Sequence, residues 1–360
     1  MSTLLHASYR LGSIELNNRL VMAPMTRCRA SADHVPTDIM ATYYGQRASA
    51  GLIISEGTSP SPNGLGYARM PGLFTDEHVA AWRMVTDEVH AKGGKIFVQL
   101  MHTGRVSHSL NMPEGACVLA PSPLAMPGTM WTDAKSMQPY PVPAAMSESD
   151  IQNAIAEFAA GAEKAIEAGF DGVELHSANG YLLDQFLNTA SNQRTDQWGG
   201  SLENRMRFVL EVACAVVARI GAERTGMRIS PYGVFNDMKP DAEMEALYEK
   251  LAGEVSKLGL VYIHVLDHSS MGSPAVPDTV KQKIRQAFKG TLIVAGGFDA
   301  ASAEAVLAAK QGDLIAFGKP FIANPDLPRR LREGRELNAP NMNSFYTPGS
   351  KGYTDYPALP

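Results

Sequence analysis

The sequence predicts a (β/α)8 barrel, an α/β fold in which eight parallel strands alternate with helices. Eight short runs of β-forming residues are spread over the 360 residues, and amphipathic helical patterns lie between most of them. The sequence contains no repeat, no low-complexity linker and no internal domain boundary. We therefore expect residues 1–360 to form a single barrel domain.

The competing architecture is a doubly wound sheet that binds dinucleotides. Such a sheet carries a G-x-G-x-x-G turn after its first strand. The nearest candidate in this chain is Gly64 and Gly66, which Arg69 follows in place of the third glycine. The sequence therefore favours the barrel.

Each expected strand is a short apolar run bounded by turn residues. The eight runs cover residues 18–22, 51–55, 95–100, 170–176, 226–230, 260–265, 291–295 and 314–317. Pro24 follows the first run and cannot donate a ladder hydrogen bond, so that strand ends before it. Ahead of the barrel, residues 7–11 and 14–16 predict a small β-hairpin that closes the barrel bottom.

Helices are expected where apolar residues recur at helical spacing. They cover residues 147–168, 201–220, 241–258 and 300–309. Ser147 and Asp150 form a capping-box pattern at the first of them, and Ser201 is the expected N-cap of the second. In that second helix Glu203 precedes Arg207 by one turn, a spacing that favours an ion pair.

The stretch after the third expected strand, residues 104–147, is rich in Pro, Met, Ser and Gly and has no sustained periodicity. A loop of this length in a compact domain is usually functional. We therefore expect a long loop excursion, with a role such as that of a lid.

Composition excludes several classes of protein. A net charge of −5 without a Lys/Arg stripe argues against nucleic acid as a partner. The three cysteines, Cys28, Cys117 and Cys214, are far apart and predict neither a disulfide framework nor a metal pair. With no signal peptide and no run of 18 apolar residues, we expect no membrane partner and a cytoplasmic location.

The fourth expected strand delivers three polar side chains to one turn. His176 ends the strand, Asn179 lies in the Ser-Ala-Asn-Gly turn, and Tyr181 follows it. A turn or a first helical turn would point His176 and Asn179 to one place. An imidazole, an amide and a phenol together suit a polarised oxygen with a proton donor beside it. Taken alone, a His at a strand end is more often a hydrogen-bonded structural residue than a catalyst. No metal is expected, because HSANGY lacks a second ligand at metal-binding spacing.

Residues that follow the strands of a barrel converge on one face. Beside His176, this face would receive Thr26, Gly57 and Gln99, together with Arg228 from within the fifth strand. Hydroxyl, amide and guanidinium groups of this kind suit the edge of a planar heterocycle. There is no Schiff-base lysine at a central strand end and no carboxylate pair.

The last two expected strands predict a phosphate site. Strand seven ends in Ala295-Gly296-Gly297 and strand eight is followed by Gly318-Lys319. Bare glycines let backbone N–H groups approach an anion, and barrels commonly hold phosphate at these two loops. A plain turn is the alternative for the glycine pair. A phosphate anchor at one end and a polar ring-edge set at the other indicate flavin mononucleotide, FMN.

Seven stretches of the chain, distributed from about residue 4 to residue 357, resemble the old yellow enzyme family, and within it the bacterial group of N-ethylmaleimide reductase and pentaerythritol tetranitrate reductase. They are APMTR at 23–27, QLMHTGR at 99–105, HSANGYLLDQFL at 176–187, TDQWGGSLENRMRF at 195–208, AGGF at 295–298, FGKPFIANPDL at 317–327 and GYTDYP at 352–357.

The resemblance implies tightly bound FMN, NADPH as reductant, and reduction of the C=C bond of α,β-unsaturated carbonyl or nitro compounds. It implies that His176 and Asn179 bind the substrate oxygen, that hydride comes from FMN N5, and that Tyr181 protonates the other carbon. Thr26, Gln99 and Arg228 match flavin-edge contacts. The remaining matches to cofactor-lining positions are Pro24, Met25, Gly57 and Gly297, and the matches to substrate-pocket positions are Tyr67, Met101 and Tyr346. For Tyr67 and Tyr346 simple packing is an equally good explanation, since an aromatic residue in a loop often only fills space.

Two positions, 101 and 319, depart from the family pattern. Met101 replaces the usual Trp, which gives a smaller and softer pocket wall. Lys319 replaces the usual Arg and keeps the charge without the bidentate fork. Asn179 stands where some relatives carry His, and it keeps a donor without a titrating proton.

Two other functions remain open on the sequence: another FMN-barrel oxidoreductase, and a non-catalytic flavin or ligand-binding sensor. The first would tend to show cluster cysteines or a catalytic Cys or Ser in a mobile loop, and the second would lack the set of His176, Asn179 and Tyr181. We expect the chain to be a monomer or a weak homodimer that acts on small-molecule activated alkenes and NAD(P)H.

Overall fold

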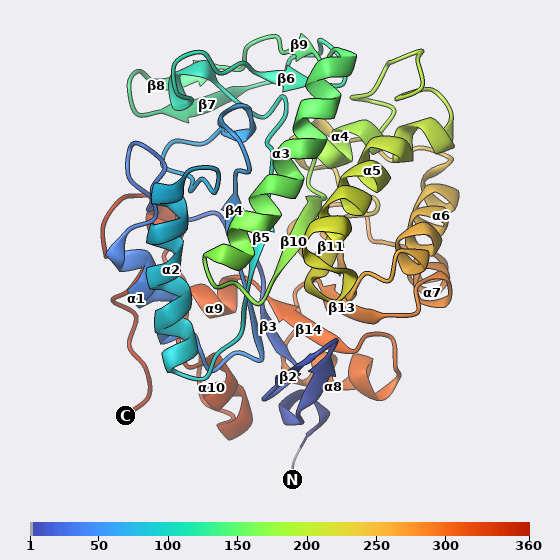
Figure 1. Cartoon of the computed structure of the whole chain (residues 1–360). Coiled ribbons are helices and arrows are strands. Elements are labelled where there is room, and N and C mark those ends of the chain that lie inside the picture. The colour runs from blue at the N-terminus through green and yellow to red at the C-terminus, as the bar shows by residue number, and fades with distance from the viewer. Residues whose placement is uncertain (1–2) are drawn as a thin grey trace.

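The barrel predicted from the sequence is confirmed. The computed structural model describes residues 3–360, and eight parallel strands close in the order β3-β4-β5-β10-β11-β12-β13-β14 (Figure 1). Their bounds are β3 Leu20–Met22, β4 Leu52–Thr58, β5 Ile96–Leu100, β10 Gly172–Ser177, β11 Thr225–Ile229, β12 Tyr262–Leu266, β13 Thr291–Ala295 and β14 Leu314–Phe317. Pairing of β14 with β3 completes the cylinder.

Helices cover the outside of the barrel (Figure 1). They are α1 Asp38–Gln46, α2 Asp76–Ala91, α3 Glu148–Glu167, α4 Leu182–Leu187, α5 Leu202–Ile220, α6 Met244–Lys257, α7 Asp278–Ala287, α8 Ala300–Ala308, α9 Lys319–Ala323 and α10 Leu327–Glu333. The predicted capping box of α3 is present: the Ser147 hydroxyl accepts from Asp150 N, and the Asp150 carboxylate accepts from Ser147 N.

Two details at the helices differ from the sequence prediction. Glu203 forms an ion pair with Lys250 of α6 instead of the expected Arg207, because α5 and α6 lie against each other. Helix α6 begins at Met244 and not at residue 241, since the Asp241 carboxylate accepts from Glu243 N at 2.9 Å and holds a turn there.

The predicted N-terminal hairpin is present at the lower end of the barrel (Figure 1). Strands β1 (Tyr9–Leu11) and β2 (Ile14–Leu16) pair antiparallel around Gly12, which has a φ of +55°. Leu11 and Leu16 are buried in the same apolar cluster as Tyr262 of β12. The hairpin therefore closes the end of the barrel opposite the predicted site.

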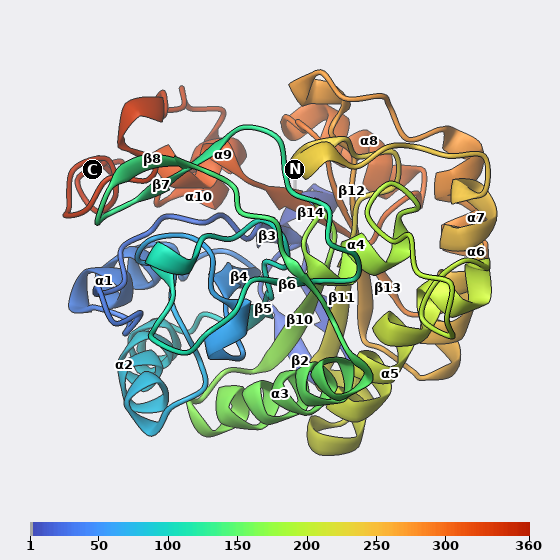
Figure 2. The ribbon, with the colours of Figure 1, turned by 90° about the horizontal axis from the view of Figure 1, so that it is seen from above.

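The excursion between β5 and α3 lies over the upper end of the barrel (Figure 2). The expected long excursion after the third barrel strand is confirmed, and it contains four short strands: β6 Leu119–Ala120, β7 Thr129–Thr132, β8 Ser136–Pro139 and β9 Ala144–Ala145. Met130 and Thr132 of β7 are buried, whereas Trp131 is half-exposed. This pairing joins segments too short to show periodicity in the sequence.

The upper barrel interior has an apolar half and a polar half. Apolar side chains come from β13, β14, β3 and β4, including Ala295, Ala316, Ala23 and Ile54. Buried polar side chains come from β5, β10, β11 and β12; they are Gln99, Glu174, His176, Arg228 and His264. The strand register places Gln99 beside Glu174, and Arg228 beside both His176 and His264.

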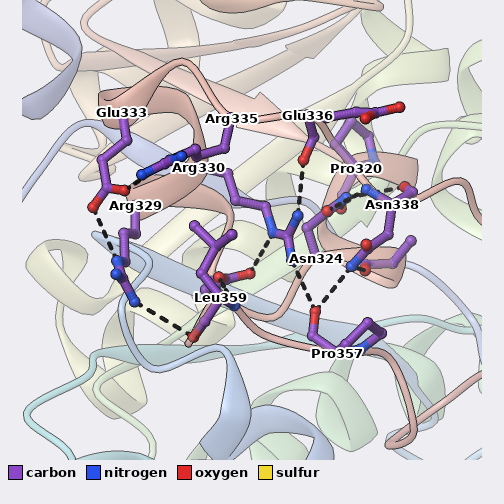
Figure 3. A network of polar contacts seen from close by, with 12 residues as sticks. Pro320, Asn324, Arg329, Arg330, Glu333, Arg335, Glu336, Asn338, Pro357 and Leu359 are labelled. Carbon is purple, nitrogen blue, oxygen red and sulfur yellow. Dashed lines mark hydrogen bonds and ion pairs between the residues drawn. The ribbon is translucent and has the colours of Figure 1, made fainter.

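The chain after α10 folds back onto the barrel. Arg330 donates to the carbonyl oxygens of Glu336 and Pro357, and Asn338 donates to those of Ala323 and Pro357 (Figure 3). Within residues 3–360, no helix is long and apolar enough to cross a membrane.

Candidate active site

The end of β10 and the turn between β10 and α4 hold the three polar residues predicted to act together: His176 lies in the strand, and Asn179 and Tyr181 follow it. The conformation of the turn differs from the expected helical turn, because Asn179 and Gly180 both have positive φ, +59° and +71°. Helix α4 starts only after Tyr181. The left-handed pair turns the chain so that His176 and Tyr181 come to lie with ring centroids 5.1 Å apart.

Two side chains of the next helix hold this turn. The Asp184 carboxylate accepts from Gly180 N at 2.8 Å, and Gln185 Nε2 donates to Gly180 O at 2.7 Å. Asn179 is held through its backbone, since its N–H donates to Ser230 Oγ and its carbonyl accepts from Asn236 Nδ2. The asparagine side chain is left for other contacts.

Several buried polar atoms at the upper end of the barrel have no hydrogen-bond partner among residues 3–360. They include His176 Nδ1, Asn179 Oδ1 and Arg228 Nε. Buried polar groups in folded proteins are nearly always satisfied. Their convergence on one place indicates that a polar ligand supplies the missing contacts.

Burial sets the protonation of the imidazole and the phenol. The pKa of His176 is lowered well below its usual value by burial first, and then by Arg228, so the ring is neutral at neutral pH. Burial raises the pKa of Tyr181 to about 12, although its hydrogen bond with Tyr67 acts in the opposite direction. Tyr181 therefore keeps its proton at neutral pH.

The three expected pocket-wall residues differ in their environment. Tyr67 Oη lies 2.9 Å from Tyr181 Oη, so this tyrosine contacts the candidate proton donor directly. Met101 is buried in one cluster with Tyr67 and Tyr181. Tyr346 is 61% exposed on the C-terminal segment, where its carbonyl accepts from Arg69 at 3.4 Å. Only the first two are enclosed beside the phenol.

We expected Gly57 to follow the second strand, but it lies inside β4. A register shift between Ile54 and Gly57 extends this strand toward the mouth, so the predicted end at residue 55 is wrong. A Cβ at Gly57 would lie 2.5 Å from Met101 Cε. The glycine therefore gives Met101 its space.

The segment after β3 contributes the other residues expected to line a cofactor. Pro24 is buried, and Met25 and Thr26 are half-buried. A Cβ at Gly318 would lie 3.5 Å from Met25 Sδ, so the loops after β3 and β14 are neighbours. Thr26 and the expected phosphate loops thus belong to one face.

The loops expected to bind phosphate emerge side by side. Ala295 at the end of β13 is in register with Ala316 of β14. Gly297 is exposed with φ of +73°, and a Cβ there would lie 2.5 Å from Ser270 Cβ. Gly318 precedes the short helix α9, and Lys319 is its exposed first residue.

Sequence reasoning missed four residues of this region: Glu174, Asp184, Gln185 and His264. Glu174 had a signal, because an acid two residues before His176 in a buried strand must point to the same side, which is the barrel interior. His264 carries the same signal in β12. Glu174 lies beside Gln99 in the polar half of the interior, and His264 contacts Glu174 there.

These residues fit FMN. The unpaired His176 Nδ1 and Arg228 Nε suit a polar ring and a substrate oxygen, and Asn179 adds an unpaired acceptor, Oδ1, beside the donor Nδ2 of the same amide. Gly297 and Gly318 give an anion access to the backbone. No group of three His, Cys, Asp or Glu side chains able to hold a metal ion occurs in residues 3–360. Fold and donor set together define a barrel oxidoreductase of the flavin-binding class.

Comparison with known proteins agrees with this class. The model of the NADH:flavin oxidoreductase / NADH oxidase family matches residues 5–338. A probable flavin mononucleotide-dependent alkene reductase of Leishmania infantum is 43% identical, over 97% of this chain and 96% of the relative.

Solved structures match over almost the whole chain. Morphinone reductase superimposes with a TM-score of 0.95 at 45% identity, covering 99% of this chain and 96% of that one, and a further structure of it holds tetrahydroNAD. The old yellow enzyme homologue from Zymomonas mobilis gives 0.93 at 41% identity, covering 99% of both chains. The chain belongs to the NADH:flavin oxidoreductase / NADH oxidase family and, within it, to the old yellow enzymes, which are FMN oxidoreductases.

Proposed function

We propose that this protein is an ene-reductase that uses FMN and NADPH to reduce the C=C bond of α,β-unsaturated carbonyl or nitro compounds. One observation carries the proposal: the buried, neutral imidazole at the end of β10 and the half-buried amide in the turn after it each have an unpaired polar atom, and a phenol that keeps its proton follows them. The name of the Leishmania relative, a probable alkene reductase, supports the same reaction.

His176 and Asn179 bind the carbonyl or nitro oxygen of the substrate. As the C=C bond accepts hydride at the β-carbon, negative charge develops on this oxygen. Two preorganised donors in a buried site stabilise that charge more than the ground state. A neutral His176 suits this role, because it donates an N–H without adding a buried charge.

Tyr181 gives its hydroxyl proton to the α-carbon. The hydrogen bond from Tyr67 holds the phenol in place and stabilises the oxygen after the proton has left. Tyr67, Met101 and Tyr346 form the substrate wall. Met101, which packs in one cluster with Tyr67 and Tyr181, sets the size of the pocket.

Residues of six strands or of the loops after them, those of β3, β4, β5, β11, β13 and β14, hold FMN, which when bound supplies the hydride. Thr26, Gln99 and Arg228 contact the polar edge of the ring, and Pro24, Met25 and Gly57 line it. Ala295, Gly296, Gly297, Gly318 and Lys319 hold the phosphate. The arrangement of adjacent glycine loops after β13 and β14 supports this assignment.

The reductant is a nicotinamide dinucleotide, since morphinone reductase has been solved with tetrahydroNAD. NADPH in preference to NADH follows from the family resemblance. Anaerobic flavin reduction at equal concentrations of the two nucleotides tests this choice; faster reduction by NADH contradicts it.

The absorption spectrum of the purified protein tests the function. We expect a flavin spectrum that NADPH bleaches and cyclohexenone restores. A colourless protein that cannot be reconstituted with FMN contradicts the proposal. A flavin that binds but is not turned over by any activated alkene would instead fit a non-catalytic flavin binder.

A further inference from the structure

A buried carboxylate lies next to Gln99 in the polar half of the barrel. Glu174 of β10 accepts from Gln99 Nε2 at 2.7 Å and contacts His264 Nδ1 at 2.9 Å. Glu174 and His264 are fully buried, and Gln99 is 2% exposed. The three side chains come from strands β5, β10 and β12, so no local sequence motif connects them.

Glu174 is ionised. Burial alone would raise its pKa, but His264 and then Arg228 outweigh it and lower the pKa below the ordinary value. Burial lowers the pKa of His264, which therefore donates as a neutral ring through Nδ1. The carboxylate is thus an acceptor only, and it fixes which atoms of its partners face it.

The ionised Glu174 carboxylate fixes the orientation of the Gln99 amide. Its NH₂ group is engaged by Glu174, so the carbonyl Oε1 is the end presented to a ligand, and no residue of 3–360 donates to that oxygen. Arg228 in the neighbouring wall has only donors. The wall therefore offers one acceptor and one donor, which matches a ring N–H flanked by a carbonyl.

We propose that Glu174, itself held by His264, is a positioning residue that orients the Gln99 amide and so makes the site selective for a ring imide N–H. This inference rests on the proposed function, because the imide is that of FMN. A purely structural ion pair explains the same contacts less well, since the other half of the interior is packed with apolar side chains at the same level.

Binding of two flavins to apoprotein tests the inference. FMN and its N3-methyl derivative, which lacks the imide N–H, are titrated by quenching of flavin fluorescence. For the wild type we expect N3-methyl-FMN to bind at least ~30-fold more weakly, since its methyl group leaves Gln99 Oε1 unpaired. If the wild-type protein binds neither flavin, that result contradicts the proposed function. It is distinct from the results below, which test the orientation of Gln99 by Glu174.

Two variants of Glu174 distinguish a role in orienting the Gln99 amide from a purely structural role. Glu174→Ala frees the amide to rotate, so the ratio of the two dissociation constants should fall about 10-fold, because one oriented hydrogen bond is lost. Glu174→Gln keeps an acceptor for Gln99 Nε2 and should retain most of the ratio. A structural role would weaken both flavins equally and leave the ratio unchanged, which overturns the inference.

Two further variants complete the design. Glu56→Gln alters another buried acid, which accepts from Arg27 N and Tyr44 Oη and not from Gln99, so its ratio should stay at the wild-type value. His264→Gln should lower the ratio about 3-fold by loosening Glu174. If Glu174→Ala does not fold, the inference is tested with His264→Gln instead. An unchanged ratio of the two dissociation constants in that variant overturns the inference.

Discussion

His176 and Tyr181 owe their protonation states to the same cause, removal from water. Burial favours the uncharged form of each ring, so it lowers the pKa of the imidazole and raises that of the phenol to about 12. One neutral donor and one intact proton source therefore coexist over the whole neutral pH range. This is the condition that the proposed reaction, hydride acceptance followed by protonation, requires.

Replacing the phenol should affect only the second half of the reaction. Tyr181→Phe removes the proton source, so we expect alkene reduction to slow by about 10²–10⁴, the range of general acid catalysis. Stopped-flow measurement of each half-reaction checks this. Flavin reduction by NADPH serves as the control, and an equal loss there would show that Tyr181 is structural.

Loss of either residue proposed to bind the substrate oxygen should weaken both alkene reduction and the binding of phenol inhibitors. His176→Ala and Asn179→Ala each remove one donor, so alkene reduction should slow by about 10²–10³ per donor. Phenols, which bind as oxygen anions, should bind more weakly in both variants, and spectral titration measures this. Unchanged turnover in both variants would exclude the assigned role.

At the scale of elements, the turn between β10 and α4 depends on the start of the helix that follows it. Asp184 and Gln185 bond the two sides of the Gly180 peptide, and Asn179 can then keep its left-handed conformation. Asp184 is buried, and burial raises its pKa to about 7. The helix thus places a titrating carboxyl directly behind the site.

This pKa makes stability depend on pH. A carboxyl whose folded-state pKa is raised contributes stability below its unfolded-state value of about 4, and that stability is lost as pH rises through about 7. Asp184→Asn cannot ionise and still offers an oxygen to Gly180 N. We expect its free energy of unfolding, relative to wild type, to rise by ~2–4 kcal/mol between pH 5 and pH 8.

Urea unfolding of both proteins at the two pH values measures this difference. Glu163→Gln, a change in an exposed ion pair with Arg219, is the matched control and should show a pH-independent difference near zero. A constant difference between Asp184→Asn and wild type would contradict the raised pKa.

For the molecule as a whole, buried arginines join the C-terminal segment to the barrel. Arg29 donates to the carbonyls of Ser344 and Phe345, and Arg27 donates to that of Gly352. These bonds fix both ends of the loop that carries Tyr346. Since Arg27 follows Thr26 directly, one segment contacts both the expected cofactor face and the C-terminal segment.

Substitution of Arg47 tests most directly whether buried arginines hold distant segments of the chain together. Its guanidinium is fully buried and donates to the carbonyls of Tyr43, Phe321 and Ile322, which lie in α1 and α9. Arg47→Met leaves these oxygens without a donor, so we expect a loss of ~3–5 kcal/mol in the free energy of unfolding. Denaturant unfolding measures it.

The matched control for that change is Arg219→Met, in an ion pair whose two side chains are more than half exposed. Its effect should stay within ~0.5 kcal/mol. Equal effects of the two substitutions would mean that Arg47 does not hold the segments together.

The sequence by itself determined the barrel and the face on which the proposed chemistry lies. Short apolar runs, helix caps such as Ser147 and turn residues are local signals, and each acts within a few residues of itself. Because strand ends of a barrel converge, His176, Gln99 and Arg228 could be assigned to one face before any contact was known. Those signals also placed the closing hairpin.

Only the tertiary structure decided the backbone conformation and the side-chain orientation of the residues on this face. The left-handed conformation of Asn179 depends on Asp184 and Ser230, and the orientation of Gln99 depends on Glu174 and a histidine from β12. Such contacts join residues far apart in the chain, and strand register and the length of β4 set them. No local pattern encodes register between distant strands, so these features required the folded molecule.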